Sequence, residues 1–117
     1  MKLITKEIER KLWSNMAKPE YKRVPYLKLF NAYGSGTWLL SEINTAASKV
    51  SSEDIVLFGL CDLGQGFPEL GYVSLAELEG QLRLGHIPMI ERDMYWKPEF
   101  TLMQYYEKAR CAGSIEF

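Results

Sequence analysis

The sequence predicts an α+β domain in which a small antiparallel sheet of about four strands packs against three helices. Three observations support this class. Capping-box patterns at Ser74 and Thr101 each precede a run of helical periodicity, residues 26–43 contain two β-rich runs separated by turn residues, and residues 55–60 are continuously apolar. The chain has 117 residues, of which 47% are hydrophobic and 25% charged, and we expect it to form a single domain over 1–117.

An N-terminal helix is expected over residues 5–15. Thr5 can cap its start, and Ile4, Ile8 and Leu12 recur at a spacing of four residues, which places them on one helical face. A basic, aromatic connection that contains two prolines follows, and the prolines exclude a continuation of the helix.

Two strands are expected next, as a hairpin. Residues 26–30 and 37–43 are β-rich, and residues 31–36 (NAYGSG) supply the turn between them. Residues 44–54 are polar, which predicts an exposed loop. The apolar run at 55–60 is typical of a strand covered on both faces, and it is therefore our candidate for the central strand.

The second half of the chain contains one more short strand, an extended segment and two capped helices. The strand is expected around residues 72–73, and Ser74 with Glu77 forms an S-x-x-E capping box for a helix whose leucines 75, 78 and 82 face inward. The loose alternation of residue types over 89–97 predicts an edge strand or an ordered extended segment. A T-x-x-Q capping box and a staple of Phe100 with Tyr105 then predict a C-terminal helix over about 101–111, with an apolar face formed by Leu102, Tyr105, Tyr106 and Ala109.

Charge is distributed unevenly, although the formal net charge is −1. Residues 1–30 contain eight basic and three acidic groups, whereas residues 31–100 contain four basic and ten acidic groups. The first segment favours contact with phosphate and the second favours a basic protein, unless both are solvated faces. No apolar stretch approaches the roughly 20 residues of a membrane span, and the two cysteines indicate no oxidising compartment, so a cytoplasmic protein is expected.

Few residues support catalysis, metal binding or a cofactor. His86 is the single histidine, and a small enzyme would have to use it with a carboxylate; a structural or exposed histidine is the alternative. Cys61 and Cys111 match no metal spacing, and we expect Cys61 to be a small buried apolar group. The glycines at 59, 64, 66 and 71 form no phosphate-binding pattern, and we expect them in turns with positive φ. The sequence therefore predicts no catalytic residue, metal or cofactor.

The segment over residues 90–98 is the most distinctive candidate surface. It places charges of alternating sign beside Met, Tyr and Trp, and these apolar types are enriched at protein interfaces. The alternative is that Tyr95 or Trp96 covers the core while the charges pair with neighbouring elements. Together with one glutamate earlier in the chain, the candidate partner-binding residues are Glu69, Glu91, Arg92, Asp93, Tyr95, Trp96 and Lys97.

A second candidate surface lies in the basic N-terminal part. Basic side chains contact phosphate, and aromatic side chains between them can stack on unpaired bases. The overall pI near 5.9 opposes strong phosphate binding. The candidate nucleic-acid-binding residues are Lys18, Lys22, Arg23 and Lys28.

Several segments together resemble the DUF2958 family. The resemblance rests on residues 57–60 (LFGL), 69–79 (ELGYVSLAELE) and 90–98 (IERDMYWKP), with support from LITKEI at 3–8 and TW at 37–38. It covers about residues 1–98 and leaves the C-terminal helix outside. The family is a domain of unknown function found in small proteins of plasmids, phages and other mobile elements, so the resemblance implies a mobile-element accessory protein and transfers no catalytic residue.

Two functional hypotheses follow, beside the enzyme that would use His86. The first is a non-catalytic protein-interaction module that blocks a host-defence complex, such as a restriction or CRISPR effector, through its acidic and aromatic surface. Its partner would be a host or element-encoded protein. The second is a single-strand nucleic-acid-binding accessory of plasmid transfer that uses the basic N-terminal segment. The sequence does not predict an oligomeric state.

Overall fold

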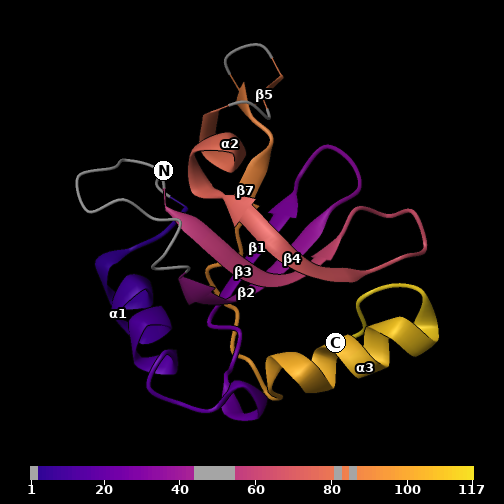
Figure 1. Ribbon diagram of the computed structural model, residues 1–117. Helices are drawn as coiled ribbons and strands as arrows, with labels where there is room; N and C mark the ends of the chain where they lie inside the picture. The colour runs from indigo at the N-terminus through magenta and orange to yellow at the C-terminus, as the bar shows by residue number, and fades with distance from the viewer. Residues whose placement is uncertain (1–2, 44–54, 81–82, 85–86) are drawn as a thin grey trace.

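A five-stranded antiparallel sheet organises the computed structural model, which describes residues 3–43, 55–80, 83–84 and 87–117 (Figure 1). The strand order is β4-β3-β2-β1-β7. The strands are β1 (Leu27–Asn31), β2 (Thr37–Ile43), β3 (Val56–Asp62), β4 (Glu69–Ser74) and β7 (Ile90–Arg92), and a separate ladder joins β5 (Arg83–Leu84) to β6 (Ile87–Pro88). The helices are α1 (Lys6–Asn15), α2 (Leu75–Gly80) and α3 (Leu102–Ala112), with a 3-10 turn η1 (Glu20–Lys22).

The predicted α+β class and the positions of the three helices are confirmed. Thr5 caps α1 and its Oγ1 accepts a hydrogen bond from the Ile8 amide at 3.1 Å. Ser74 Oγ accepts from the Glu77 amide at 3.3 Å, where α2 begins. At α3 the Thr101 capping box is complete. These local signals determine helix starts because each satisfies amide groups that the helix itself leaves unpaired.

The sheet differs from the prediction in strand number and in the identity of its middle strand. The segment over 89–97 does contribute an edge strand, but β7 is a fifth strand and pairs with β1. The middle strand is β2, and the apolar run that we expected in the centre is β3, between β2 and the edge strand β4. Two polar residues, Ser41 and Glu42, make β2 look partly exposed from its sequence. In the structure Ser41 is fully buried at a register shift in the β2–β3 ladder, and Glu42 forms an ion pair with Arg23.

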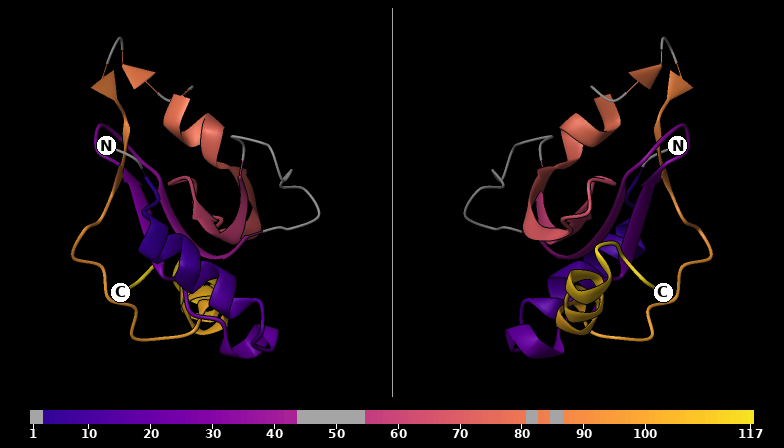
Figure 2. Two further views of the ribbon diagram at one scale, coloured as in Figure 1. Left: turned by 90° about the vertical axis from the view of Figure 1, so that its left-hand side faces the viewer. Right: turned by 90° about the vertical axis from the view of Figure 1, so that its right-hand side faces the viewer.

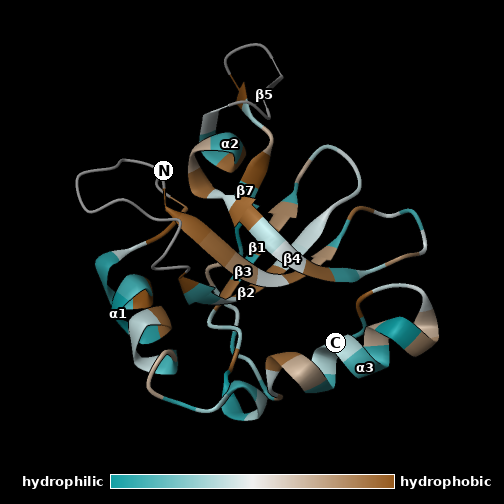
Figure 3. Cartoon of the chain, viewed as in Figure 1, coloured by the Kyte–Doolittle hydropathy of each residue, from teal (hydrophilic) through white to brown (hydrophobic). Residues whose placement is uncertain are grey.

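Each face of the sheet supports its own apolar core. Leu12 of α1 and Leu75 of α2 pack with Leu40 and Leu57 on one face. On the other face α3 packs onto Leu39, together with Leu60. Figure 3 shows the hydrophobic colour concentrated on the strands and hydrophilic residues on the outer turns of α1 and α3. The alternation of Leu39 and Leu40 between the two cores is the period-two pattern of a strand covered on both faces.

A long-range hydrogen bond to Asp62 holds the end of the chain against the sheet. Asp62 is buried; its Oδ1 accepts from the Gly64 amide at 2.9 Å and its Oδ2 accepts from the Ile115 amide at 3.0 Å. Ile115 itself belongs to the core beneath α3. One carboxylate therefore ties both the β3–β4 turn and the C-terminal tail to the end of β3.

The glycine prediction is confirmed at two positions and wrong at two. Gly64 and Gly66 have positive φ in the turn between β3 and β4, whereas Gly59 and Gly71 do not. Gly59 is required for a different reason, because a Cβ atom there would lie 2.0 Å from the Leu39 carbonyl oxygen of the neighbouring strand.

The predicted loop at 44–54 and His86 lie outside the described residues.

Candidate partner-binding surface

The turn that follows β7 is fixed by Asp93. The Asp93 amide donates to the Lys28 carbonyl at 3.0 Å, which joins the start of the turn to β1. Asp93 Oδ1 then accepts from the Tyr95 amide at 3.0 Å, and the Asp93 carbonyl accepts from the Trp96 amide at 3.3 Å. An aspartate that bonds its own backbone two residues later forms an Asx turn, a local structure that restricts the conformations of the next residues.

This turn places two adjacent aromatic residues in opposite environments. Trp96 is partly buried; its Nε1 donates to the Pro25 carbonyl at 2.7 Å, and its ring lies 5.7 Å from the Tyr105 ring. Tyr95 is 91% exposed, and its neighbour Met94 is 66% exposed. Of the two predicted aromatic anchors, Trp96 fastens the segment to the core, and Tyr95 is presented to solvent.

The charges of this segment are partly neutralised within the molecule. Lys28 Nζ lies 3.4 Å from Asp93 Oδ2, and both side chains are largely covered. The same ammonium group lies 4.0 Å from the centre of the Phe117 ring. Asp93 and Lys28, which the sequence placed in two different candidate sites, are therefore partners of each other.

The remaining partner-binding candidates divide between the two edges of the sheet. Glu91 and Arg92 lie on the edge strand β7, where they pair in register with Phe30 and Leu29 of β1. Lys97 is exposed just beyond the turn. Glu69 begins β4 at the opposite edge. Four inter-strand steps of about 4.8 Å separate the two edges, so Glu69 does not belong to the surface around Tyr95.

The nucleic-acid candidates differ in their surroundings. Arg23 forms a mostly buried ion pair with Glu42, and its Nε donates to the Lys18 carbonyl at 3.0 Å. Lys18 Nζ lies 3.2 Å from the Tyr26 hydroxyl. Lys22 is exposed beside Tyr21 on η1, and its ammonium group lies 5.8 Å from that ring centre. Arg23 thus has a structural role in joining the segment after α1 to β2.

A groove of about 260 Å³ between α1 and the β1–β7 edge brings members of both candidate sets together. Lys11 was not among the sequence candidates. The signal for it was its place on α1 one turn after Glu7, with which it forms an ion pair at 3.6 Å. The groove is lined by Thr5, Glu7, Ile8, Lys11, Tyr26, Lys28, Arg92, Asp93, Met94 and Trp96.

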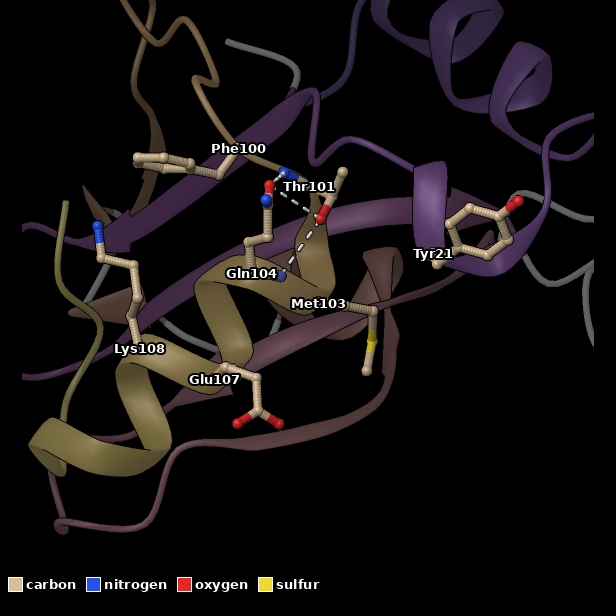
Figure 4. Close-up of a pocket in the computed structure, with 7 residues that line it drawn as sticks. All are labelled: Tyr21, Phe100, Thr101, Met103, Gln104, Glu107 and Lys108. Carbon is tan, nitrogen blue, oxygen red and sulfur yellow. Dashed lines mark hydrogen bonds between the residues drawn. The ribbon is translucent and has the colours of Figure 1, made fainter.

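A second hollow of about 490 Å³ lies at the start of α3 (Figure 4). Figure 4 shows Gln104 bent back onto Thr101 in the capping box, while Tyr21 lies on the far side of Met103. Its walls are mainly apolar, and its charged groups, Glu107 and Lys108, are exposed on α3. This arrangement offers an apolar depression and no paired nucleophile and base among the lining residues.

Cysteine and metal chemistry find little support in the described part of the chain. Burial raises the pKa of the Cys61 thiol to about 11, with a further contribution from the charge of Glu69, so this thiol is protonated at neutral pH. Cys61 is half-buried, whereas the sequence predicted a buried side chain. Cys111 is exposed. Within the described ranges, no group of three or more His, Cys, Asp or Glu side chains is placed to hold a metal ion. Nor is any helix there long and apolar enough to cross a membrane.

Comparison with known families gives one match. The family model for DUF2958, described as a protein of unknown function, matches residues 3–116. The chain belongs to the DUF2958 family. The match corrects the extent of the resemblance, because the DUF2958 match continues through α3 and most of the C-terminal tail, which we had left outside. No curated protein and no solved structure matches this DUF2958 chain.

Proposed function

We propose that this DUF2958 protein is a non-catalytic protein-interaction module whose main contact is the turn over residues 93–97. The observation that carries the proposal is the 91% exposure of Tyr95 on a turn fixed by three hydrogen bonds of Asp93, two through its backbone and one through its side chain. A tyrosine supplies a large contact area with few rotatable bonds, and a fixed backbone lowers the entropy lost on binding.

The surroundings of Tyr95 have the composition of an interface. Met94 is exposed beside it and also lines the groove, which makes the apolar area continuous with a concave region. The exposed Lys97 and the half-buried Arg92 and Glu91 supply polar groups around this apolar centre. An apolar centre within a polar rim is the usual organisation of a protein–protein contact.

The positions of the acidic residues give them a smaller part in the proposed contact than the sequence predicted. Asp93 is engaged by Lys28, and Glu69 lies on the other edge of the sheet. Glu91 is the acidic candidate that stays near the turn. We therefore assign the leading contact to Tyr95 and Met94, and the acidic side chains a secondary part.

The proposed partner is a protein of a host-defence complex, such as a restriction or CRISPR effector. This part of the proposal draws on the mobile-element setting that the family resemblance implies. A small domain that occupies a surface of such a complex needs no active site.

Affinity capture from host lysate tests the proposal. The wild-type protein, Tyr95→Ala and the control Tyr33→Ala are each used as bait, with and without nuclease, because Tyr33 is also exposed (55%) but lies in the β1–β2 turn. We expect one protein to be captured by the wild type and by Tyr33→Ala after nuclease treatment, and to be lost with Tyr95→Ala. Equal capture by all three baits would contradict the assignment.

A second candidate function, single-strand nucleic-acid binding, is favoured by the lysines around Tyr26. Lys11 Nζ and Lys18 Nζ lie 5.8 and 5.5 Å from the centre of the Tyr26 ring, at the side of the groove. Such a site would bind a single-stranded oligonucleotide with strong salt dependence. Fluorescence anisotropy with a labelled oligonucleotide at low salt measures it, and Lys11→Glu should abolish the signal while Lys108→Glu, on α3, should preserve it.

A further inference from the structure

Strand β4 forms one edge of the five-stranded sheet. Its partner is β3, and the described residues place no strand on its other side. The two strands pair over six consecutive positions, from Val56↔Ser74 to Cys61↔Glu69, without a register shift. Residues 69–74 (ELGYVS) include no lysine, arginine or proline. Bulges, lysines and prolines are the features that usually prevent an edge strand from pairing with another chain.

The opposite edge, formed by β7, has features that oppose pairing with another chain. Strand β7 has three residues, and two of them, Glu91 and Arg92, are charged. The fixed turn at Asp93 then leads the chain away from the sheet. Figure 2 shows β4 and the β7 chain on opposite sides of the sheet, so an additional strand would be accepted at the β4 side.

Exposed apolar side chains lie on β4 and in the turn that precedes it. Phe67 is 78% exposed, Tyr72 is 63% exposed and Leu63 is 55% exposed. Leu63 and Phe67 also line a hollow of about 250 Å³ together with Cys61 and Glu69. Removal of such apolar area from water favours association at this edge.

We propose that β4 pairs in antiparallel orientation with β4 of a second copy of the chain. A two-fold axis perpendicular to the sheet requires one residue to face itself, and Gly71 suits that position because a Cβ there would have no atom within 4 Å. This register places Leu70 opposite Tyr72 of the second copy, and Glu69 opposite Val73. No two carboxylates face each other, and an aromatic side chain gains an apolar cross-strand neighbour on each side of the axis.

The expected association is weak and depends on concentration. In this register β4 pairs with its copy over residues 69–73, five positions, which is smaller than the roughly 800 Å² per partner of a standard stable interface. The pairing is independent of the proposed partner contact, because β4 and Tyr95 lie at opposite edges of the sheet. Failure of one proposal therefore leaves the other intact.

Sedimentation velocity of the full chain over a hundredfold concentration range tests the pairing. We expect the average mass of the wild type to rise towards that of a dimer, and that of Tyr72→Lys to stay at the monomer value, because a lysine at this edge opposes pairing. The matched control is Tyr33→Lys, which changes an exposed tyrosine elsewhere and should behave as the wild type. A wild-type mass that stays monomeric throughout would overturn the proposal.

Cross-linking tests the register. Gly71→Cys and the control Gly80→Cys both place a Cβ in open space, so both variants should fold. The exposed Cys111 is replaced by serine in each, and the protonated Cys61 is common to both. Under mild oxidation we expect at least tenfold more disulfide-linked dimer with Gly71→Cys. Equal amounts in the two variants, or none in either, would contradict pairing centred on Gly71.

Discussion

The indole nitrogen of Trp96 donates a 2.7 Å hydrogen bond to the carbonyl of Pro25, which lies 71 residues earlier in the chain. This bond holds the segment after β7 against the segment that enters β1. Because Trp96 is fixed from inside and Asp93 from the β1 side, the intervening Tyr95 is presented outward on a backbone with little freedom. This division of roles between adjacent aromatic residues is the structural basis of the proposed interaction surface.

Substitution of Asp93 should weaken both the turn and partner binding. Asp93→Ala removes the acceptor of the Tyr95 amide and the partner of Lys28, and we expect it to lower the free energy of unfolding by about 1–2 kcal/mol. Lys28→Met removes the ion pair and leaves the Asx turn. Partner capture should therefore fall with Asp93→Ala and persist with Lys28→Met. Equal loss in both variants would show that the charge pair matters and the turn does not.

Asp62 should be among the most sensitive polar positions of the chain. Asp62→Ala leaves the buried Ile115 amide and the Gly64 amide without their acceptor, which costs about 2–4 kcal/mol for two such groups. Urea unfolding followed by circular dichroism measures the loss. Glu116→Ala, an exposed change in the same tail, should alter stability by less than about 0.5 kcal/mol. If Asp62→Ala unfolded at the same urea concentration as the wild type, the result would contradict the role assigned to this carboxylate.

Gly59 and Gly71 should respond oppositely to the same change. Gly59→Ala forces a Cβ against the Leu39 carbonyl and should destabilise the fold by more than about 3 kcal/mol or prevent folding. Gly71→Ala places its Cβ in open space on β4 and should leave the stability nearly unchanged or slightly raised. Thermal unfolding of the pair compares them directly. Similar melting temperatures would show that the two strands do not approach as described.

The two cysteines should differ in reactivity, and stability should fall at high pH. Because burial raises the pKa of Cys61 to about 11, a thiol reagent at pH 8 should label Cys111 quickly and Cys61 slowly. The folded state holds this proton more tightly than the unfolded state, so stability decreases as the pH rises above the ordinary thiol pKa towards 11. Cys61→Ala should remove that part of the pH dependence. Rapid labelling of both thiols in the folded protein would contradict the covered position of Cys61.

The sequence was most informative where structure depends on nearby residues. The capping box at Thr101 and the stripe of Ile4, Ile8 and Leu12 predict their helices because each pattern lies within one or two turns. The hairpin of β1 and β2 follows in the same way from its turn residues.

The strand order could not be predicted in this way. Ser41 and Glu42 make β2 look partly exposed, and only the ion pair with Arg23 and the register shift explain how the middle strand accommodates them. The order also determines that Glu69 and Glu91 lie on opposite edges, although both were assigned to one surface.

The opposite orientations of Tyr95 and Trp96 were also inaccessible from local pattern. Their separation depends on the Asx turn at Asp93 together with the bond from Trp96 to Pro25, which lies 71 residues earlier in the chain. The prediction of an edge strand in this segment is confirmed at its start, where β7 lies, and the segment then turns at Asp93.

Photo-cross-linking from position 95 tests the central claim most directly. A benzophenone amino acid replaces Tyr95 in one protein and Tyr33 in a control, since both side chains are exposed and Tyr95→Ala itself should change stability by less than about 0.5 kcal/mol. Irradiation in nuclease-treated host lysate should give one discrete protein adduct from position 95 and none from position 33. No adduct from position 95, or the same adducts from both positions, would contradict the assignment of this turn as the interaction surface.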